Sequence, residues 1–217
     1  MARRVVIVGA IDRWTMDHGR QRPILVAAIL LMLLGIPPAS ANWSGTTGLT
    51  GCGWGSPVNT ADGGTHWFHY IDLRSQVSSA VNYSRAYNLD PTDLVTGYDS
   101  SLDSATDVIV RDQDYVDYCG ITWHSPTSGG TIGLATCDSR TGLKCEQHTV
   151  RFDLSYIANA TTSEERGLAC HELGHSVGLT HRDSECGCMK SSAPMPAYYT
   201  DHDNSHLKSA YREIPEE

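Results

Sequence analysis

Five short segments of the chain have the β-branched and aromatic content that is typical of β-strands. They cover residues 67–73, 107–110, 118–123, 131–137 and 149–154. The last of them, TVRFDL, alternates polar and apolar residues, as a strand with one buried face does. The pattern therefore predicts a sheet built from these five segments.

Two other segments have the periodicity of helices. Residues 75–87 place Val77, Ala80, Val81 and Ala86 at helical spacing, and the sequence NLDP that follows ends the helix. A longer helix begins within residues 161–165, where Thr162 and Glu165 have the spacing of a capping box, and it runs to about Gly178. Strands and helices alternate without an internal repeat, which predicts an α+β or α/β class.

The N-terminus has the pattern of an export signal. Five arginines precede the apolar run ILVAAILLMLLGI at residues 24–36, which is short for a membrane span and matches a signal-peptide core. Two prolines end the run, and the small residues Ala39 and Ala41 form a signal-peptidase site. We expect a signal peptide over residues 1–41 and a secreted chain beginning at Asn42. An uncleaved N-terminal membrane anchor is the alternative.

The remaining chain has the composition of one folded domain. Residues 42–65 are rich in Gly, Thr and Ser and are expected to form an entry segment, which leaves residues 66–217 for the domain. Hydrophobic residues make up 40% of the sequence, and the net charge of −9 excludes a basic surface for nucleic acid or for an anionic membrane. Seven cysteines indicate an oxidising compartment. We expect a monomer without stable membrane association after signal cleavage.

The candidate chemistry lies on the longer helix, in the sequence HELGHSVGLTH. His171 and His175 are four residues apart, so both imidazoles can reach one metal ion from the same helix face. Glu172 can then reach a water on that ion without binding the ion itself. Gly178 permits a left-handed turn after the helix, which lets the chain bring His181 to the same ion. Three histidines leave one position of a tetrahedral Zn²⁺ open for water.

This motif, H-E-x-x-H-x-x-G-x-x-H, resembles the metzincin zinc proteases, and the segment from about residue 149 to residue 211 is most similar to their matrixin (matrix-metalloprotease-like) branch. The resemblance implies a zincin-like α+β fold: a twisted mixed sheet packed on the active-site helix, then a methionine turn and a C-terminal helix. Met189 has the spacing of that methionine, and Met195 is the alternative.

The same resemblance implies a secreted zinc endopeptidase that acts on a protein or peptide substrate. The substrate would lie extended along an edge strand near residues 131–137, and the segment 189–199 would wall the pocket for the residue after the cut. Tyr198 and Tyr199 are candidates for that pocket, and ordinary surface tyrosines are an equally good interpretation.

Two other classes of function stay open. One is a catalytically inactive secreted zinc-binding module, an adhesin or decoy on the same fold, although the intact Glu172 argues against it. The other is a metal hydrolase of small amides. Further ion sites are weaker: a second zinc would draw on His66, His69, His124 and His148. A structural Ca²⁺ would draw on Asp112, Asp114 and Asp117, which lack the glycine and terminal glutamate of a helix-loop-helix site.

The cysteines allow three further expectations. Cys137 and Cys145 can close a short loop. Cys186 and Cys188 are too close to bond readily to each other, so each is expected to pair elsewhere. Cys170 precedes a metal ligand on the helix and is expected to be buried and free, because metzincins have a small core residue there.

Overall fold

The computed structural model describes residue 52 and residues 60–212. The signal peptide expected over residues 1–41 and most of the entry segment lie outside these described residues. Within the described part of the chain, no helix is both long and apolar enough to cross a membrane.

A five-stranded mixed sheet forms the base of the domain, in the order β2-β1-β3-β5-β4. Strands β1, β2, β3 and β5 run parallel to one another, whereas β4 runs antiparallel to β5. Strand β4 is therefore an edge strand with β5 as its one neighbour. The bounds of the strands are Thr65–Ile71 for β1, Val95–Tyr98 for β2, Val108–Gln113 for β3, Gly133–Thr141 for β4 and Lys144–Asp153 for β5.

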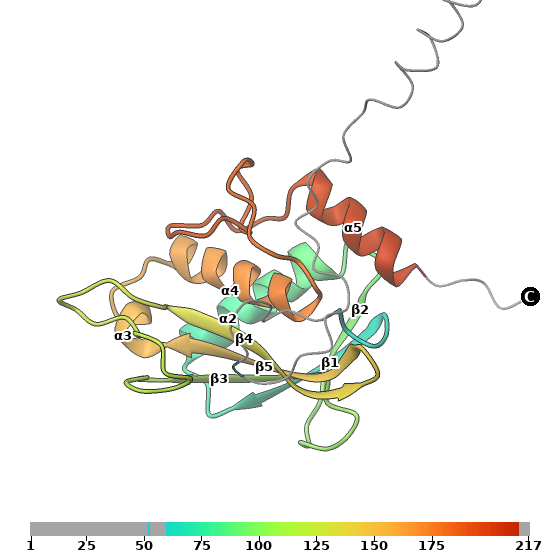
Figure 1. Cartoon of the computed structure of the whole chain (residues 1–217), viewed down its shortest axis with the longest axis horizontal. Coiled ribbons are helices and arrows are strands. Elements are labelled where there is room, and N and C mark those ends of the chain that lie inside the picture. The colour runs from blue at the N-terminus through green and yellow to red at the C-terminus, as the bar shows by residue number, and fades with distance from the viewer. Residues whose placement is uncertain (1–51, 53–59, 213–217) are drawn as a thin grey trace, which may run out of the picture. The chain divides into compact units, whose positions relative to one another are not determined.

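The helices α2 and α4 lie side by side over one face of the sheet (Figure 1). Helix α2 (Ser75–Ser84) continues into one π-helical turn, η1 (Arg85–Leu89), and the short α3 (Leu154–Ile157) follows β5. Helix α4 (Thr162–Ser176) carries the histidine motif, and α5 (Asp201–Tyr211) is the C-terminal helix. The predicted α+β class, mixed sheet and C-terminal helix are confirmed.

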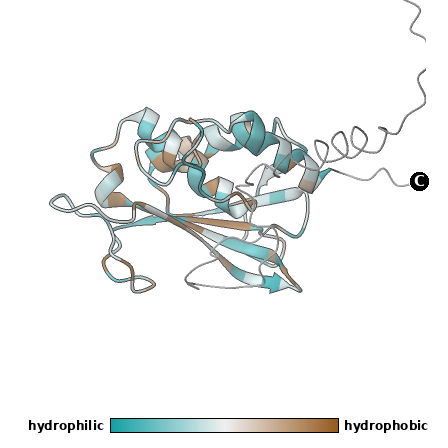
Figure 2. Cartoon of the chain, turned by 45° about the horizontal axis from the view of Figure 1, so that its top comes forward, coloured by the Kyte–Doolittle hydropathy of each residue, from teal (hydrophilic) through white to brown (hydrophobic). Residues whose placement is uncertain are grey.

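The core lies between the helix layer and the sheet, where Figure 2 shows the apolar colour of both layers. Alternation along β5 turns Val150 and Phe152 toward the helices, where both are fully buried. Leu168 and Leu173 of α4 pack from the other side and are also inaccessible to solvent. Because so much of α4 is buried, the helix is a rigid support for the side chains of its motif.

Four of the five predicted strands are confirmed, and residues 118–123 are not a strand. Cys119 and Gly120 both adopt positive φ, at 61° and 63°, which breaks extended backbone. The aromatic residues of this loop pack against other side chains. The ring of Tyr118 lies 4.4 Å from the Arg151 guanidinium, and Trp123 stacks on Tyr115. Strand β2 was not predicted, since its four residues VTGY include a glycine.

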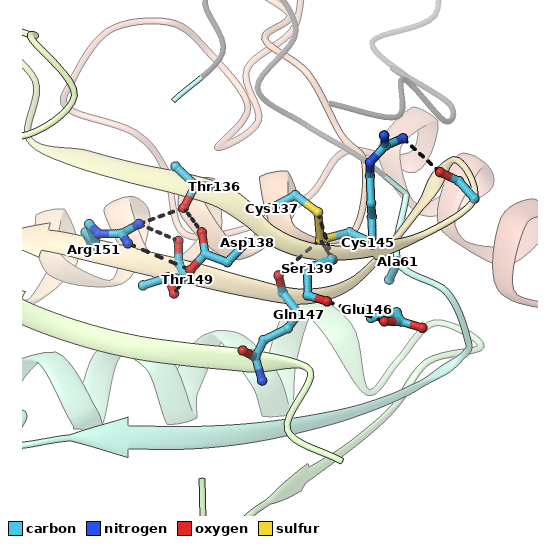
Figure 3. Close-up of a disulfide and its surroundings, with 12 residues drawn as sticks. Ala61, Thr136, Cys137, Asp138, Ser139, Cys145, Glu146, Gln147, Thr149 and Arg151 are labelled. Atoms are coloured by element: carbon cyan, nitrogen blue, oxygen red, sulfur yellow. Dashed lines mark hydrogen bonds and ion pairs between the residues drawn. A yellow bond between two sulfur atoms is a disulfide. The ribbon is translucent and has the colours of Figure 1, made fainter. Parts of the chain in front are cut away.

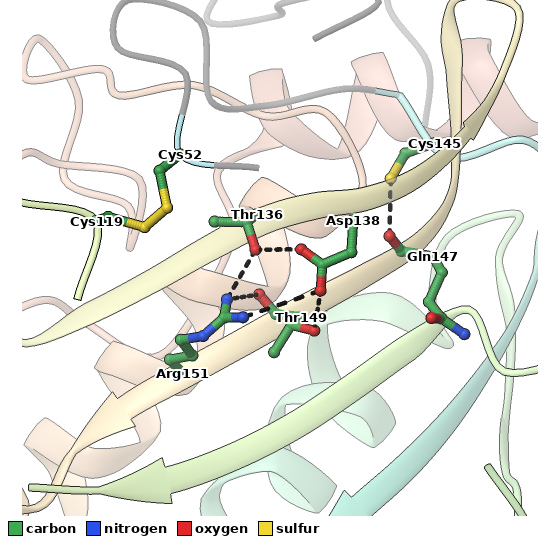
Figure 4. Close-up of polar contacts among 8 residues, drawn as sticks. All are labelled: Cys52, Cys119, Thr136, Asp138, Cys145, Gln147, Thr149 and Arg151. Atoms are coloured by element: carbon green, nitrogen blue, oxygen red, sulfur yellow. Dashed lines mark hydrogen bonds and ion pairs between the residues drawn. A yellow bond between two sulfur atoms is a disulfide. The ribbon is translucent and has the colours of Figure 1, made fainter. Parts of the chain in front are cut away.

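Arg151 projects from β5 on the face of the sheet opposite the helices and is held by a polar network (Figure 4). Its guanidinium donates to Thr136 Oγ1 at 2.7 Å and lies 3.9 Å from a carboxylate oxygen of Asp138. Thr149 Oγ1 donates to the same carboxylate. This network ties β4 to β5 beside the edge of the sheet.

Three disulfides connect six of the seven cysteines: Cys52–Cys119, Cys137–Cys145 and Cys170–Cys188. The second, predicted from the sequence, bridges β4 and β5 (Figure 3). Cys170 is buried as expected, but the expectation of a free thiol is wrong, because the segment after the metal motif returns under α4 and places Cys188 against it. Cys186 is the free and exposed cysteine instead, so the expectation of a disulfide is wrong for Cys186 and confirmed for Cys188.

Candidate metal centre

Helix α4 begins with a capping box and ends in a turn that redirects the chain. The cap is Thr161 with Glu164, one residue earlier than predicted, since Thr161 has extended backbone at φ −77° and ψ 159°. At the other end the amide of Leu179 donates to the Gly174 carbonyl, and Gly178 has φ 94°. This is a Schellman motif, which returns the chain toward the helix it has just left.

The turn brings His181 to the two histidines of the helix. The Nε2 atoms of His171 and His175 lie 3.1 Å apart, and His181 Nε2 lies 3.1 Å from His171 and 3.2 Å from His175. The three residues predicted as ligands therefore present three ring nitrogens to one point. Their arrangement could hold a metal ion.

Backbone carbonyls fix which ring nitrogen faces that point. His171 Nδ1 lies 2.8 Å from the carbonyl oxygen of Cys188, and His175 Nδ1 lies 2.7 Å from that of Leu179. A carbonyl oxygen only accepts, so each Nδ1 carries the hydrogen and each Nε2 has a free lone pair. Lone pairs that converge in this way repel one another, and a cation between them removes the repulsion.

Burial keeps these imidazoles neutral. Desolvation lowers the pKa of His171 to about 4 and holds the pKa of His175 well below its ordinary value, and the neighbouring imidazoles act in the same direction. Neutral imidazole is the form that binds metal, so these rings need not lose a proton near pH 7.

Glu172 lies beside the three histidines and is 3% exposed. Its side chain packs against Gly133 of β4, where a Cβ atom would collide with the carboxylate. One carboxylate oxygen, Oε2, has no hydrogen-bond partner among the described residues. Burial raises the pKa of Glu172 to about 8, against a backbone hydrogen bond from Ala135 that lowers it. An ionisable group held this way in a cleft is typical of acid–base chemistry.

Met189 packs against helix α4 at the histidine motif. It is 1% exposed, and its sulfur fills the space that the missing side chain of Gly174 leaves on α4. Met195, the alternative, packs its backbone carbonyl on Gly167, nearer the start of the helix. Met189 therefore packs on the helix residue that directly precedes His175, and its role as the methionine of a methionine turn stays a prediction.

A cleft of about 770 Å³ opens over the histidines and Glu172. One wall is formed by residues 129–132, which lead into β4, together with residues 133–135 at the start of β4. The other wall is the segment 191–195. His124 and Tyr156 also line the cleft, and their rings meet edge to face at 5.6 Å. The two walls overlap residues 131–137 and 189–199, the two segments that the resemblance implies for substrate binding, and substrate binding there stays a prediction.

The two pocket tyrosines do not line this cleft. Tyr199 is buried beneath α4 and donates its hydroxyl to the Cys170 carbonyl at 3.1 Å, so it supports the helix from the side away from the cleft. Tyr198 is 50% exposed outside the cleft. Ala193 and Met195 occupy the wall in their place.

The weaker ion sites gain no support among the described residues. His66, His69 and His124 belong to no group of three potential ligands, and neither do the three aspartates considered for calcium. His148 lies near Cys137 and Cys145 in such a group, but the disulfide between those cysteines removes their thiolates.

Three supporting groups had not been predicted. Gly133 makes room for Glu172, and the carbonyls of Leu179 and Cys188 orient the ligands. The glycine in TIGLATC is a visible signal, since a glycine inside a strand marks a close approach. Backbone carbonyls leave no such signal in a sequence.

Comparison of the chain with models of known protein families and with curated proteins finds no match. The case for a function therefore depends on the geometry of the site and on the motif itself.

Proposed function

We propose that this protein is a secreted zinc-dependent endopeptidase with a zincin-like fold, similar to the matrixin branch of the metzincins. One observation carries the proposal: three convergent Nε2 atoms lie beside a buried carboxylate with one unpartnered oxygen, at the base of a cleft along an edge strand. A hydrolase that activates water on a metal needs these groups together.

Zinc fits the donor set best. Three neutral imidazoles are typical ligands of a catalytic zinc site, with one position left for water. When Zn–N bonds are about 2.0–2.1 Å long in a tetrahedral centre, the nitrogens lie roughly 3.3 Å apart. The separations of 3.1–3.2 Å between the histidine nitrogens are close to that value. Zinc held by His171, His175 and His181 would acidify a water and polarise the substrate carbonyl.

Glu172 is the general base of this proposal. A cation held by the three histidines would favour the ionised form of Glu172 over the protonated form that burial favours. The free Oε2 of the ionised carboxylate would then accept a proton from the attacking water and deliver it to the leaving amine. Gly133 lets β4 pass close to the carboxylate, so the side chain of Glu172 cannot move further toward that strand. Burial removes competing water, which strengthens the interaction of the carboxylate with the reacting groups.

The edge position of β4 supports an extended substrate. An edge strand has unpaired backbone groups on one side, and a peptide that lies along it can pair as a further strand. The cleft runs along the start of β4 and closes against the segment 191–195. A protein or peptide chain therefore fits the site better than a small amide, because a small amide would occupy only a fraction of the length of the cleft.

We also propose that the protein is exported from the cell. The three disulfides form and persist in an oxidising environment, in agreement with the signal-peptide pattern at the N-terminus. The acidic charge gives no support to a nucleic-acid or membrane partner.

Cleavage of a generic protein tests the activity. Casein incubated with the purified protein should be cut at internal bonds, the activity should stop with a zinc chelator, and added Zn²⁺ should restore it. An inactive adhesin or decoy would bind zinc without cutting casein, and a small-amide hydrolase would leave casein intact but hydrolyse acyl amides. A peptide library then defines the residues preferred on each side of the cut.

A further inference from the structure

A second histidine pair lies on α5 and does not line the cleft described above. His202 and His206 are four residues apart, and their Nε2 atoms lie 3.1 Å from each other. Both side chains are partly exposed. Residues at this spacing are neighbours on one face of a helix, one turn apart.

The geometry of this pair repeats that of the two ligands on α4. The ring centroids of His202 and His206 are 4.5 Å apart with an interplanar angle of 87°, against 4.6 Å and 85° for His171 and His175. The Nε2 separation is 3.1 Å in both pairs. Two imidazoles that can share an ion on one helix can therefore share an ion on the other.

The helix that carries the pair is well anchored. Thr200 and Asp203 form a capping box, and Leu207 and Tyr211 are buried beneath the helix. Side chains fixed on a rigid helix lose little freedom when they bind an ion, which favours binding. The start of α5 also packs on Gly187, in the loop that leads to Cys188 and Met189 below the histidine motif.

We infer that His202 and His206 form a second site, for a divalent transition-metal ion such as Zn²⁺ or Cu²⁺, with water in the remaining positions. Imidazole is a preferred ligand of these ions, whereas Ca²⁺ and Mg²⁺ prefer oxygen. Two protein ligands hold an ion less tightly than three, so this site fills after the first. The ion joins two turns of α5 and stabilises the helix. The inference does not depend on the proposed protease activity.

Metal stoichiometry tests this inference. The protein is made without a histidine tag, stripped of metal and dialysed against increasing Zn²⁺, and bound zinc is measured. The parent should bind two equivalents, and the second should raise the melting temperature. The double variant His202→Gln/His206→Gln should bind one equivalent, and its melting temperature should not respond to further zinc. The variant His175→Ala should keep the weaker equivalent.

A matched control keeps the number of histidines constant. The exchange His206→Lys/Lys208→His moves one imidazole to the sixth position after His202, about 120° away around the helix. This variant should bind one equivalent while its circular dichroism without metal equals that of the parent. Saturation of the parent at one equivalent would overturn the inference and leave the protease proposal standing, because the two imidazoles would then be a hydrogen-bonded pair. A second equivalent in both α5 variants would overturn it as well.

Discussion

At Gly133 the edge strand passes so close to α4 that an added methyl group would meet the carboxylate of Glu172. The substitution Gly133→Ala should therefore displace the carboxylate while the three histidines stay in place. A displacement of about 1 Å in a catalytic group typically costs about 10²-fold in rate. Casein cleavage should fall by about that factor with zinc content unchanged.

The control is Gly129→Ala, in the same wall of the cleft, where an added methyl group meets no atom within 4 Å. It should retain the cleavage rate of the parent. Equal losses in both variants would show that Gly133 does not act through Glu172.

Asp107, just before β3, provides a test of electrostatics away from the site. Burial, with smaller contributions from Asp62 and Asp99, raises the pKa of Asp107 to about 6, although its carboxylate accepts the Trp67 amide. Between about pH 4 and pH 6, the raised pKa keeps the Asp107 carboxyl protonated in the folded chain, whereas the same carboxyl is ionised in the unfolded chain. This group therefore lowers the stability of the fold as pH rises through that window.

The substitution Asp107→Asn keeps an acceptor for the Trp67 amide and removes the titration. The melting temperature of the variant minus that of the parent should increase from pH 4 to pH 6 and then stay constant. Thermal unfolding at unit steps of pH measures this difference. A difference that does not change with pH would contradict the assignment.

At the scale of elements, the disulfide Cys170–Cys188 joins α4 to the loop below it. It closes a sequence separation of 18 residues, and a loop of that length corresponds to about 3 kcal/mol of stability. The carbonyl of Cys188 also orients His171. Replacing both cysteines with alanine, in a Cys186→Ser background that prevents mispairing, should lower stability by about that amount. It should also weaken zinc binding about 10–100-fold, as loss of a group that orients a ligand does.

The disulfide Cys137–Cys145 serves as the control, since it joins β4 to β5 and lies in a different side-chain cluster from His171, His175 and His181. Its double alanine variant should lose stability and keep the zinc affinity of the parent. Denaturant unfolding and competitive zinc titration measure the two effects. Equal zinc affinities in both double variants would mean that the disulfide is not needed to keep the carbonyl of residue 188 against His171.

The elements that the sequence predicts correctly depend on local physics. Helix α4 follows from its capping residues, and the meeting of the three histidines follows from helical spacing and the turn at Gly178. Contacts between segments that lie far apart in the sequence leave no local sequence pattern from which they could be predicted. The pairing of Cys170 depends on where the chain returns after residue 181, and that path is set by packing under α4.

Over the whole molecule, the mixed sheet places its edge strand beside the candidate metal centre. The order β2-β1-β3-β5-β4 puts β4 beside α4, so one cleft contains both an open strand edge and the buried carboxylate. Sequence patterns predict four of the five strands but not their order. The loop 118–123 resembles a strand in composition because it contains aromatic residues, and these pack on Arg151 and on Tyr115.

The central claim is that Glu172 acts on water while the three histidines hold zinc. The most direct test measures bound zinc and peptide cleavage together in the parent, Glu172→Gln and His175→Ala. The glutamine variant should keep the zinc content of the parent and lose about 10²–10⁴-fold in turnover, since that is what a general base contributes. The alanine variant should lose both zinc affinity and turnover. A Glu172→Gln protein that cleaves at the parent rate would contradict the account.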